Sequence, residues 1–153
     1  MTSQTTLLYD ADCGFCRTVL GAILMRDREL RIRPVALQDA LAAELLPEMS
    51  EEDRFASFHV VDESGTIRSG GAALLPLADA LRAGALRSAL ASVPALTDAA
   101  YRLVAANRAR IGPAIPAGWT RRADATIRRR ERELGGDVVG QASGELAEAA
   151  PAE

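Results

Sequence analysis

The sequence predicts an α/β fold: a small mixed sheet, made of a β-α-β unit and a β-hairpin, with flanking helices and extra C-terminal helices. Residues 5–9 form an apolar and β-branched run that is typical of a buried strand. Residues 13–26 follow with apolar side chains at helical spacing, and residues 30–35 alternate apolar with basic side chains, as a half-exposed strand does. The two strands of such a unit lie parallel with a right-handed crossover, and Pro34 indicates an edge strand or its end.

The middle of the chain predicts the hairpin. Residues 37–46 favour a short helix, and residues 48–54 an acidic connection at the surface. Strand character resumes at residues 55–61, a Glu-Ser-Gly turn follows, and residues 66–69 form the returning strand. We therefore expect an antiparallel pair beside the β-α-β unit.

The chain is predicted to be helical from residue 72 onward. A helix over residues 72–82 accommodates Pro76 only if this proline falls within the first turn. Apolar stripes over residues 86–93 and 96–111 predict two further helices, which a Gly- and Pro-rich segment then ends.

A charged extension follows this domain. We divide the chain into a domain over residues 1–112 and an extension over residues 113–153. Residues 120–134 predict a charged helix with almost no apolar face, capped by a Gly-Gly pair, and the Ala-, Gly- and Glu-rich remainder is expected to be disordered. Its arginines either form a solvated face or contact an acidic partner.

Composition excludes several functional classes. With 18 basic against 21 acidic residues the net charge is −3, so the protein as a whole has no electrostatic reason to bind nucleic acid or an anionic membrane. No apolar run is long enough for a membrane span, and the first residues do not resemble a signal peptide. We expect a cytoplasmic protein, where a lone Cys-x-x-Cys pair is more often redox-active or metal-binding than structural.

The two cysteines, Cys13 and Cys16, are predicted to lie at the start of a helix, where they can close a small disulfide ring. The partial positive charge of a helix N-terminus favours thiolate over thiol, so Cys13 is the expected nucleophile. Cys16 lies one turn deeper on the apolar stripe with Val19 and Leu20, where burial disfavours ionisation. It is the expected resolving thiol, which attacks a mixed disulfide already formed on Cys13.

Three charged residues close to the cysteine pair in the sequence each have two interpretations. Asp10 is either a carboxylate that exchanges protons with Cys16 or a turn-forming residue. Asp12 either disfavours a thiolate at Cys13 or, as we expect, points to solvent and caps the helix. Arg17 either stabilises the thiolate or is an exposed arginine on the helix surface.

Zinc is the main rival to redox chemistry. Structural zinc needs four ligands, and besides carboxylates the chain offers only its two cysteines and the solitary His59. A site within one subunit would be incomplete, although two chains sharing their pairs would complete it. We expect His59 to be an outward-facing strand residue, and we expect no metal site and no cofactor.

The segment Leu8-Tyr9-Asp10-Ala11-Asp12-Cys13-Gly14-Phe15-Cys16 resembles the DCC family of thiol-disulfide oxidoreductases, named for an Asp-x-x-Cys-x-x-Cys motif that Asp10, Cys13 and Cys16 match. The similarity covers most of residues 7–112. It continues through Arg26-Asp27, Pro34-Val35-Ala36-Leu37-Gln38, Val60-Val61-Asp62, Gly65, Ser69-Gly70-Gly71-Ala72 and Asp98-Ala99-Ala100-Tyr101-Arg102-Leu103-Val104-Ala105-Ala106-Asn107-Arg108. A match to both the cysteine motif and the segment at residues 98–108, in the same order and far apart in the chain, indicates the family much more specifically than the two cysteines alone.

The resemblance implies a thioredoxin-like fold and makes Asp10 the family's acidic residue. Tyr101, Asn107 and Arg108 match the second motif, where they serve either helix packing or the site. The chain has no proline just before the strand at residue 55, where thioredoxins place a cis-proline that receives substrate backbone.

These features lead to one main hypothesis, a thiol-disulfide oxidoreductase that acts on a disulfide-containing protein or a small-molecule thiol substrate. The alternative is a non-enzymatic redox-sensing or metal-binding module of the same fold. We expect neither nucleic acid nor a membrane as partner, and the sequence does not give the oligomeric state.

Overall fold

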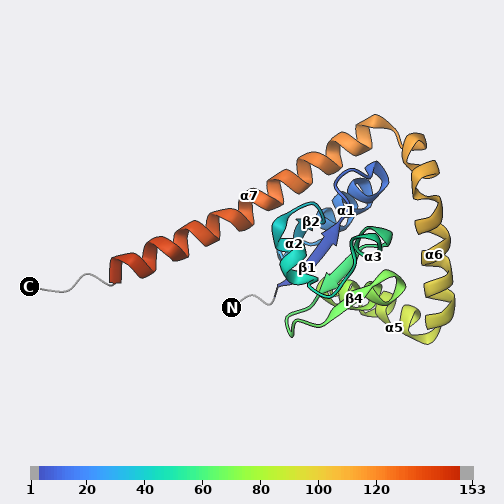
Figure 1. Cartoon of the computed structure of the whole chain (residues 1–153), viewed down its shortest axis with the longest axis horizontal. Coiled ribbons are helices and arrows are strands. Elements are labelled where there is room, and N and C mark those ends of the chain that lie inside the picture. Colours follow the sequence, from blue (N-terminus) through green and yellow to red (C-terminus); the bar gives the residue numbers. More distant parts are fainter. Residues whose placement is uncertain (1–3, 149–153) are drawn as a thin grey trace, which may run out of the picture.

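The computed structural model describes the backbone of residues 4–148 and the side chains of residues 4–135. Its centre is a four-stranded mixed sheet in the order β2-β1-β3-β4 (Figure 1). The strands are β1 (Thr5–Tyr9), β2 (Ile32–Ala36), β3 (His59–Val61) and β4 (Ile67–Ser69). β1 lies parallel to β2 and antiparallel to β3, which pairs antiparallel with β4. The predicted β-α-β unit, the edge position of the strand with Pro34 and the hairpin are confirmed, and this sheet with its helices is compatible with the expected thioredoxin-like α/β fold.

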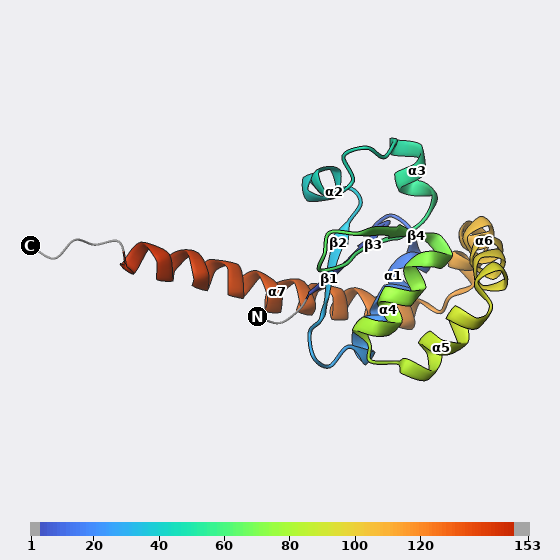
Figure 2. The same ribbon diagram turned by 90° about the horizontal axis from the view of Figure 1, so that it is seen from below.

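Both faces of the sheet are covered by helices, and successive side chains of β1 point to opposite faces, so β1 contributes to the packing on both. Leu7 and Tyr9 pack in one cluster with residues of α1 (Gly14–Arg26) and α4 (Leu74–Ala80). Leu8 packs in a second cluster beside α2 (Ala40–Leu45). Figure 2 shows the sheet edge-on, with α2 and α3 on one side and α1 and α4 on the other.

α1 is the crossover helix that connects β1 to β2. Leu20 and Leu24, four residues apart, lie on one face of the helix and are buried against the sheet. The predicted helix is confirmed, and its N-terminus lies directly after the end of β1. Both cysteines are therefore held where a buried strand ends and a helix begins.

The acidic segment after α2 differs from the prediction of a surface connection. Residues Glu51–Ala56 form the short helix α3, so the predicted strand at residues 55–61 is reduced to β3. Ser50 caps the helix, since its hydroxyl oxygen accepts a hydrogen bond from the backbone N–H of Asp53 at 3.1 Å. The acidic side chains of the first turn face the positive end of the helix dipole, which stabilises them there.

The helices after the hairpin are confirmed close to their predicted positions. Pro76 lies in the first turn of α4, as required. The remaining elements are the 3-10 helix η1 (Gly70–Ala73), α5 (Gly84–Ser92), α6 (Pro94–Ile111) and the 3-10 helix η2 (Gly112–Ala114). Neither α5 nor α6 contains a fully buried residue, so both helices lie at the margin of the core.

The charged helix at the C-terminus, α7 (Ala117–Glu148), is longer than predicted. It continues through the Gly-Gly pair that was expected to cap it, and residues 137–148, expected to be disordered, are helical; residues 149–153 lie outside the described residues. Within residues 4–148, no helix combines the length and apolar character needed to cross a bilayer.

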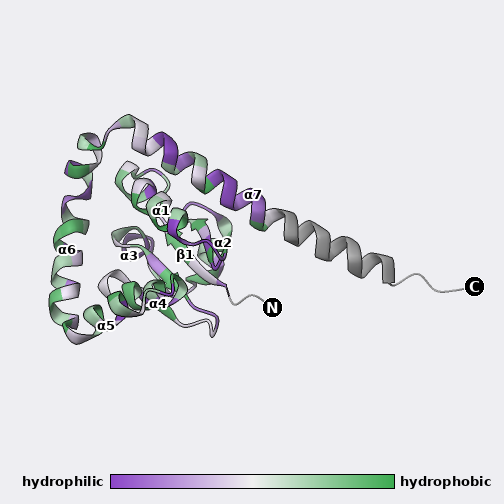
Figure 3. Cartoon of the chain, turned by 180° about the vertical axis from the view of Figure 1, so that it is seen from behind, coloured by the Kyte–Doolittle hydropathy of each residue, from purple (hydrophilic) through white to green (hydrophobic). Residues whose placement is uncertain are grey.

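α7 also has a buried face, which the sequence did not predict. Ala123 and Ile127 are buried against the domain, although many residues of this stretch are strongly hydrophilic (Figure 3). α7 lies so close to α1 that a Cβ atom added at Gly21 would be 2.5 Å from both the Cα and the Cβ of Ala123. Only glycine permits this approach of the two helices.

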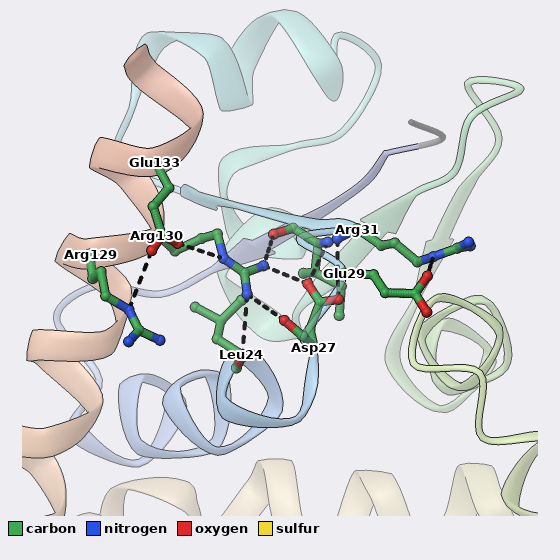
Figure 4. Close-up of polar contacts among 8 residues, drawn as sticks. Leu24, Asp27, Glu29, Arg31, Arg129, Arg130 and Glu133 are labelled. Atoms are coloured by element: carbon green, nitrogen blue, oxygen red, sulfur yellow. Dashed lines mark hydrogen bonds and ion pairs between the residues drawn. The ribbon is translucent and has the colours of Figure 1, made fainter. Parts of the chain in front are cut away.

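A buried ion pair fixes the same contact (Figure 4). Arg130 is 2% exposed and Asp27 is 4% exposed. The Arg130 guanidinium donates to the Asp27 carboxylate and to three backbone carbonyl oxygens, those of Leu24, Asp27 and Ile32. The carboxylate also accepts the backbone N–H groups of Arg31 at 3.1 Å and Ile32 at 2.8 Å. Arg130 is thus no part of a solvated charge run, because its side chain is buried and its hydrogen-bond acceptors belong to Leu24, Asp27 and Ile32.

Candidate active site

Cys13 is the N-cap residue of α1. Its backbone is extended, with φ −87° and ψ 108°, and its Sγ accepts a hydrogen bond from the backbone N–H of Cys16 at 3.3 Å. The expectation that Asp12 caps the helix is therefore wrong, because the helix begins one residue later and the cap position belongs to the cysteine. A sulfur in this position accepts an amide hydrogen bond and lies at the positive end of the helix dipole.

Cys16 lies one turn further along α1, half-buried, and both cysteines are free thiols. Burial is the largest of the effects that raise the pKa of Cys16 from 9.0 to about 12; a hydrogen bond with Cys13 and the charges of Cys13 and Asp10 add to it. The positive charge of Arg108 acts in the opposite direction. At neutral pH Cys16 is therefore a protonated thiol.

A polar cluster holds the loop between β1 and α1. The Gln38 side-chain amide donates to the Asp10 carboxylate at 2.9 Å and to the Asp12 carboxylate at 3.1 Å, and its oxygen accepts the backbone N–H of Ala11 at 3.2 Å. The same Asp10 oxygen accepts the backbone N–H of Asp12 at 3.0 Å. Asp10 is thus a turn-forming residue, as one interpretation had it, and its proton transfer with Cys16 stays a prediction.

Gln38 was not predicted as a site residue. It lies just after β2, the parallel neighbour of β1, and the carboxyl ends of parallel strands meet at the same edge of a sheet. That placement follows from the predicted β-α-β unit and is the feature that would have identified it.

Arg17 connects the loop to α7. Its guanidinium donates to the backbone oxygen of Ala11 at 2.8 Å and pairs with the carboxylate of Asp124 at 3.0 Å. The side chain is about one third exposed, so it is not the free surface arginine of the second interpretation. Its described partners are a carbonyl and a carboxylate, and stabilisation of a thiolate at Cys13 by Arg17 stays a prediction.

A pocket of about 500 Å³ lies beside Cys16, between α1, α4, α5 and α6. Cys16 and Phe15 form part of its wall, and the rest is largely apolar. Tyr101 and Arg108 also line it, so the structure brings these two residues of the second motif to the cysteine pair. Asn107 lies apart and bonds the Leu103 carbonyl oxygen of its own helix at 2.8 Å.

Tyr101 and Arg108 have structural contacts as well. The Tyr101 hydroxyl accepts the backbone N–H of Phe58 at 3.2 Å, and the two rings meet edge to face at 5.3 Å. Arg108 donates to the backbone oxygens of Phe55 at 2.6 Å and Ala56 at 3.5 Å. Both residues therefore attach α6 to the segment that leads into β3, and they also lie beside the thiols.

Both backbone groups of Phe58, the residue just before β3, are already hydrogen-bonded. The N–H of Phe58 donates to Tyr101, and its carbonyl oxygen accepts the N–H of Gly70 at 3.2 Å. Between residues 4 and 148 there is no cis peptide bond. Main-chain pairing of a substrate at Phe58 would require these two hydrogen bonds to break.

His59 is buried, in contrast to the outward-facing strand residue that was expected. It is 1% exposed, and its ring nitrogens bond the Ser69 hydroxyl at 2.7 Å and the Arg54 carbonyl oxygen at 2.9 Å. Burial lowers the pKa of His59, so the ring is neutral at neutral pH. β3 has a neighbour on each side and a helix layer on each face, which leaves no outward direction.

Metal ligands do not assemble in the part of the chain that the structure describes: no group of three or more His, Cys, Asp or Glu side chains is placed to hold an ion. Residues 7–113 match the family of DCC1-like thiol-disulfide oxidoreductases. Comparison with curated proteins gives no match, and neither does comparison with solved structures.

Proposed function

The chain belongs to the DCC1-like thiol-disulfide oxidoreductase family, and on this premise we propose that it exchanges disulfides through Cys13 and Cys16. The observation that carries the proposal is the asymmetry of the two thiols. Cys13 accepts an amide hydrogen bond at the helix N-terminus, whereas Cys16 is a protonated thiol one turn below. The first position favours attack on a disulfide, and the second suits a thiol that reacts only after a bond has formed.

In the first step, the thiolate of Cys13 attacks one sulfur of the substrate disulfide. A bond forms between the Cys13 Sγ and that sulfur, the substrate S–S bond breaks, and the departing thiolate takes a proton from solvent. The amide N–H of Cys16 stabilises the attacking thiolate before the reaction.

In the second step, Cys16 transfers its proton to the Asp10 carboxylate and attacks the Cys13 Sγ. The mixed disulfide breaks, the second substrate thiolate leaves and is protonated, and the chain retains a Cys13–Cys16 disulfide. The substrate has gained two electrons and the cysteine pair has lost two, which an external dithiol restores. Arg108 supports this step, because its charge lowers the pKa of Cys16 and so stabilises the transient thiolate.

The proposed partners are a disulfide-containing protein or a small-molecule thiol substrate, and the proposed location is the cytoplasm. Two free cysteines with no other cysteine in the chain suit a compartment in which thiols stay reduced.

Two single substitutions test the division of roles. Cys13→Ser should abolish dithiol-driven reduction of a small disulfide, whereas Cys16→Ser should accumulate a mixed disulfide on Cys13 that mass spectrometry detects. If the wild-type chain exchanges no disulfide and purifies with stoichiometric zinc, the proposal is wrong and the metal-binding alternative replaces it.

The proton transfer is tested by a matched pair of carboxylates. Asp10 and Asp12 both bind the Gln38 amide, but only Asp10 is among the effects on the pKa of Cys16. Asp10→Asn should slow resolution of a preformed mixed disulfide about 100-fold or more at neutral pH, since a positioned base contributes about that much. Asp12→Asn should leave this rate within about threefold, because the exposed Asp12 carboxylate transfers no proton. Equal effects of the two substitutions would rule out a special role for Asp10.

A further inference from the structure

The pocket beside Cys16 lies at the margin of the domain. Its outer wall consists of α5 and α6, neither of which buries a residue fully, while α1 and α4 form its inner wall. Its volume of about 500 Å³ lies within the range of about 300–1,000 Å³ typical of small-molecule sites. The two outer helices thus enclose space instead of filling it.

The walls of the pocket are apolar on both sides. Aliphatic side chains from the inner and outer helices face the same space, and they include Val19, Ile23, Leu77, Leu90, Leu96 and Val104. Water in such a space finds few hydrogen-bond partners, and an empty apolar space forfeits dispersion contacts along its whole lining. An apolar occupant would relieve both costs.

Arg108 supplies the one full positive charge among the residues that line the pocket. Two backbone carbonyl oxygens hold its guanidinium in place, and among the residues whose side chains the structure describes no carboxylate forms an ion pair with it. A fixed guanidinium at an apolar wall is complementary to a carboxylate, which it binds through charge-assisted hydrogen bonds. The occupant that fits is therefore apolar over most of its length and anionic at one end.

We propose that this pocket binds a small lipophilic carboxylate, with its head group at Arg108 and its hydrocarbon chain between α1 and the α5–α6 pair. Four helices line the site and make it concave, which favours a small molecule over a flat protein surface. Binding requires no disulfide exchange, so the proposal stands or falls separately from the redox activity. A head group at Arg108 lies beside the resolving thiol, which places the ligand where it can influence resolution.

The test is calorimetric titration of the full chain with n-alkyl carboxylates of eight to twelve carbons, each below its micellar concentration. We expect one site per chain and an affinity that rises about fourfold with each added methylene, the effect of removing one methylene from water. The n-alkanol of equal length should bind at least about fivefold more weakly, because it has no charge to pair with Arg108. No saturable binding, or equal binding of carboxylate and alkanol, would overturn the proposal.

Two substitutions of exposed alanines on the same helix locate the site. Ala100 lines the pocket and Ala106 does not. Ala100→Trp should fill the space and abolish carboxylate binding, whereas Ala106→Trp should leave the affinity within about twofold of wild type. Both variants should keep the wild-type circular dichroism, since both alanines are exposed on α6.

Arg108→Gln and Arg108→Lys separate charge from shape. The glutamine variant should lose the preference for carboxylate over alkanol, and the lysine variant should retain most of it. The proposal would be overturned if the alkyl carboxylate bound Ala100→Trp as tightly as it binds the wild type. It would also be overturned if the wild-type chain dimerised with rising concentration and only Ala100→Trp prevented this, because the surface would then bind a second copy of the chain.

Discussion

The two ends of α1 are held in opposite ways. At the N-terminal end, Gln38 and Arg17 position the cysteine loop through hydrogen bonds that are exposed or half-buried. At the C-terminal end, a buried ion pair and a glycine contact fix the helix to α7. The comparison indicates that one helix carries both the reactive end, which must admit a substrate, and the end that anchors the domain.

The largest expected effect is at the anchored end. Arg130→Met removes the guanidinium and leaves the carboxylate of Asp27 buried without its partner, which typically costs about 3–5 kcal/mol in the free energy of unfolding. Denaturation by urea, followed by circular dichroism, measures this change. The matched control is Arg129→Met on the exposed side of α7, which should change the free energy of unfolding by about 0.5 kcal/mol or less. Similar losses for the two arginines would show that the buried pair does not anchor α7.

A second prediction compares two glycines in the same helix. Gly21→Ala forces a methyl group against the backbone of Ala123 and should cost about 1–3 kcal/mol in unfolding free energy, as overpacking does. Gly14 lies at the reactive end and has no atom within 4 Å of an added Cβ, so Gly14→Ala should be neutral or slightly stabilising. Chemical denaturation of both variants checks this, and a neutral Gly21→Ala would show that α7 can move away from α1.

A smaller loss of stability is expected at the polar cluster of the reactive end. Gln38→Ala removes donors to Asp10 and Asp12, whose carboxylates remain accessible to water, and should cost about 1 kcal/mol. Gln38→Glu places a third carboxylate there and should cost more at pH 7 than at pH 4, where carboxyl groups begin to be protonated. Thermal unfolding at both pH values measures the difference. An identical pH response of the two variants would contradict this account of the cluster.

The last prediction concerns ionisation and should scarcely affect the fold near neutral pH. Burial is the largest effect that raises the pKa of Cys16, and it persists when Cys13 is replaced. Alkylation of Cys16 by iodoacetamide in the Cys13→Ser variant should therefore accelerate about tenfold per pH unit from pH 7 to pH 9 without levelling off. A plateau below pH 9 would contradict the raised pKa.

The raised pKa of Cys16 also makes the stability of the fold depend on pH, and it sets the direction of that dependence. The folded chain retains the Cys16 proton up to about pH 12, whereas the unfolded chain loses it near pH 9.0. This contribution to stability is complete below pH 9 and is lost as the pH rises towards 12. Cys16→Ser should therefore show a weaker alkaline loss of stability than the wild type.

Much of the reactive end could be predicted from the sequence, because its determinants are local. The apolar run of β1, the helical spacing after Cys13 and the alternation in β2 lie close together in the chain, and they fixed the position of both thiols. Gln38 was missed because no local pattern marks it, and its place beside the cysteine loop follows only when the carboxyl ends of the two parallel strands are considered together.

The anchored end could not be predicted in the same way. Arg130 lies in a run of arginines and differs from its neighbours only in facing α1, which depends on the packing of elements about 100 residues apart. His59 was missed for a similar reason, since its burial follows from helices on both faces of the sheet. The capped start of α3, by contrast, was present in the sequence as a serine followed by three acidic residues, a pattern typical of a helix N-terminus.

The attachment of α7 has a practical consequence for choosing the ends of a recombinant fragment. The family match ends at residue 113, yet Ala123, Ile127 and Arg130 complete the packing around α1. A fragment cut at the boundary of the match would expose Gly21 to solvent, leave the carbonyl oxygen of Leu24 without its Arg130 donor and remove the counterion of Asp27. The smallest piece expected to fold includes α7 through Glu133, although every residue of the redox motif lies more than 100 positions earlier.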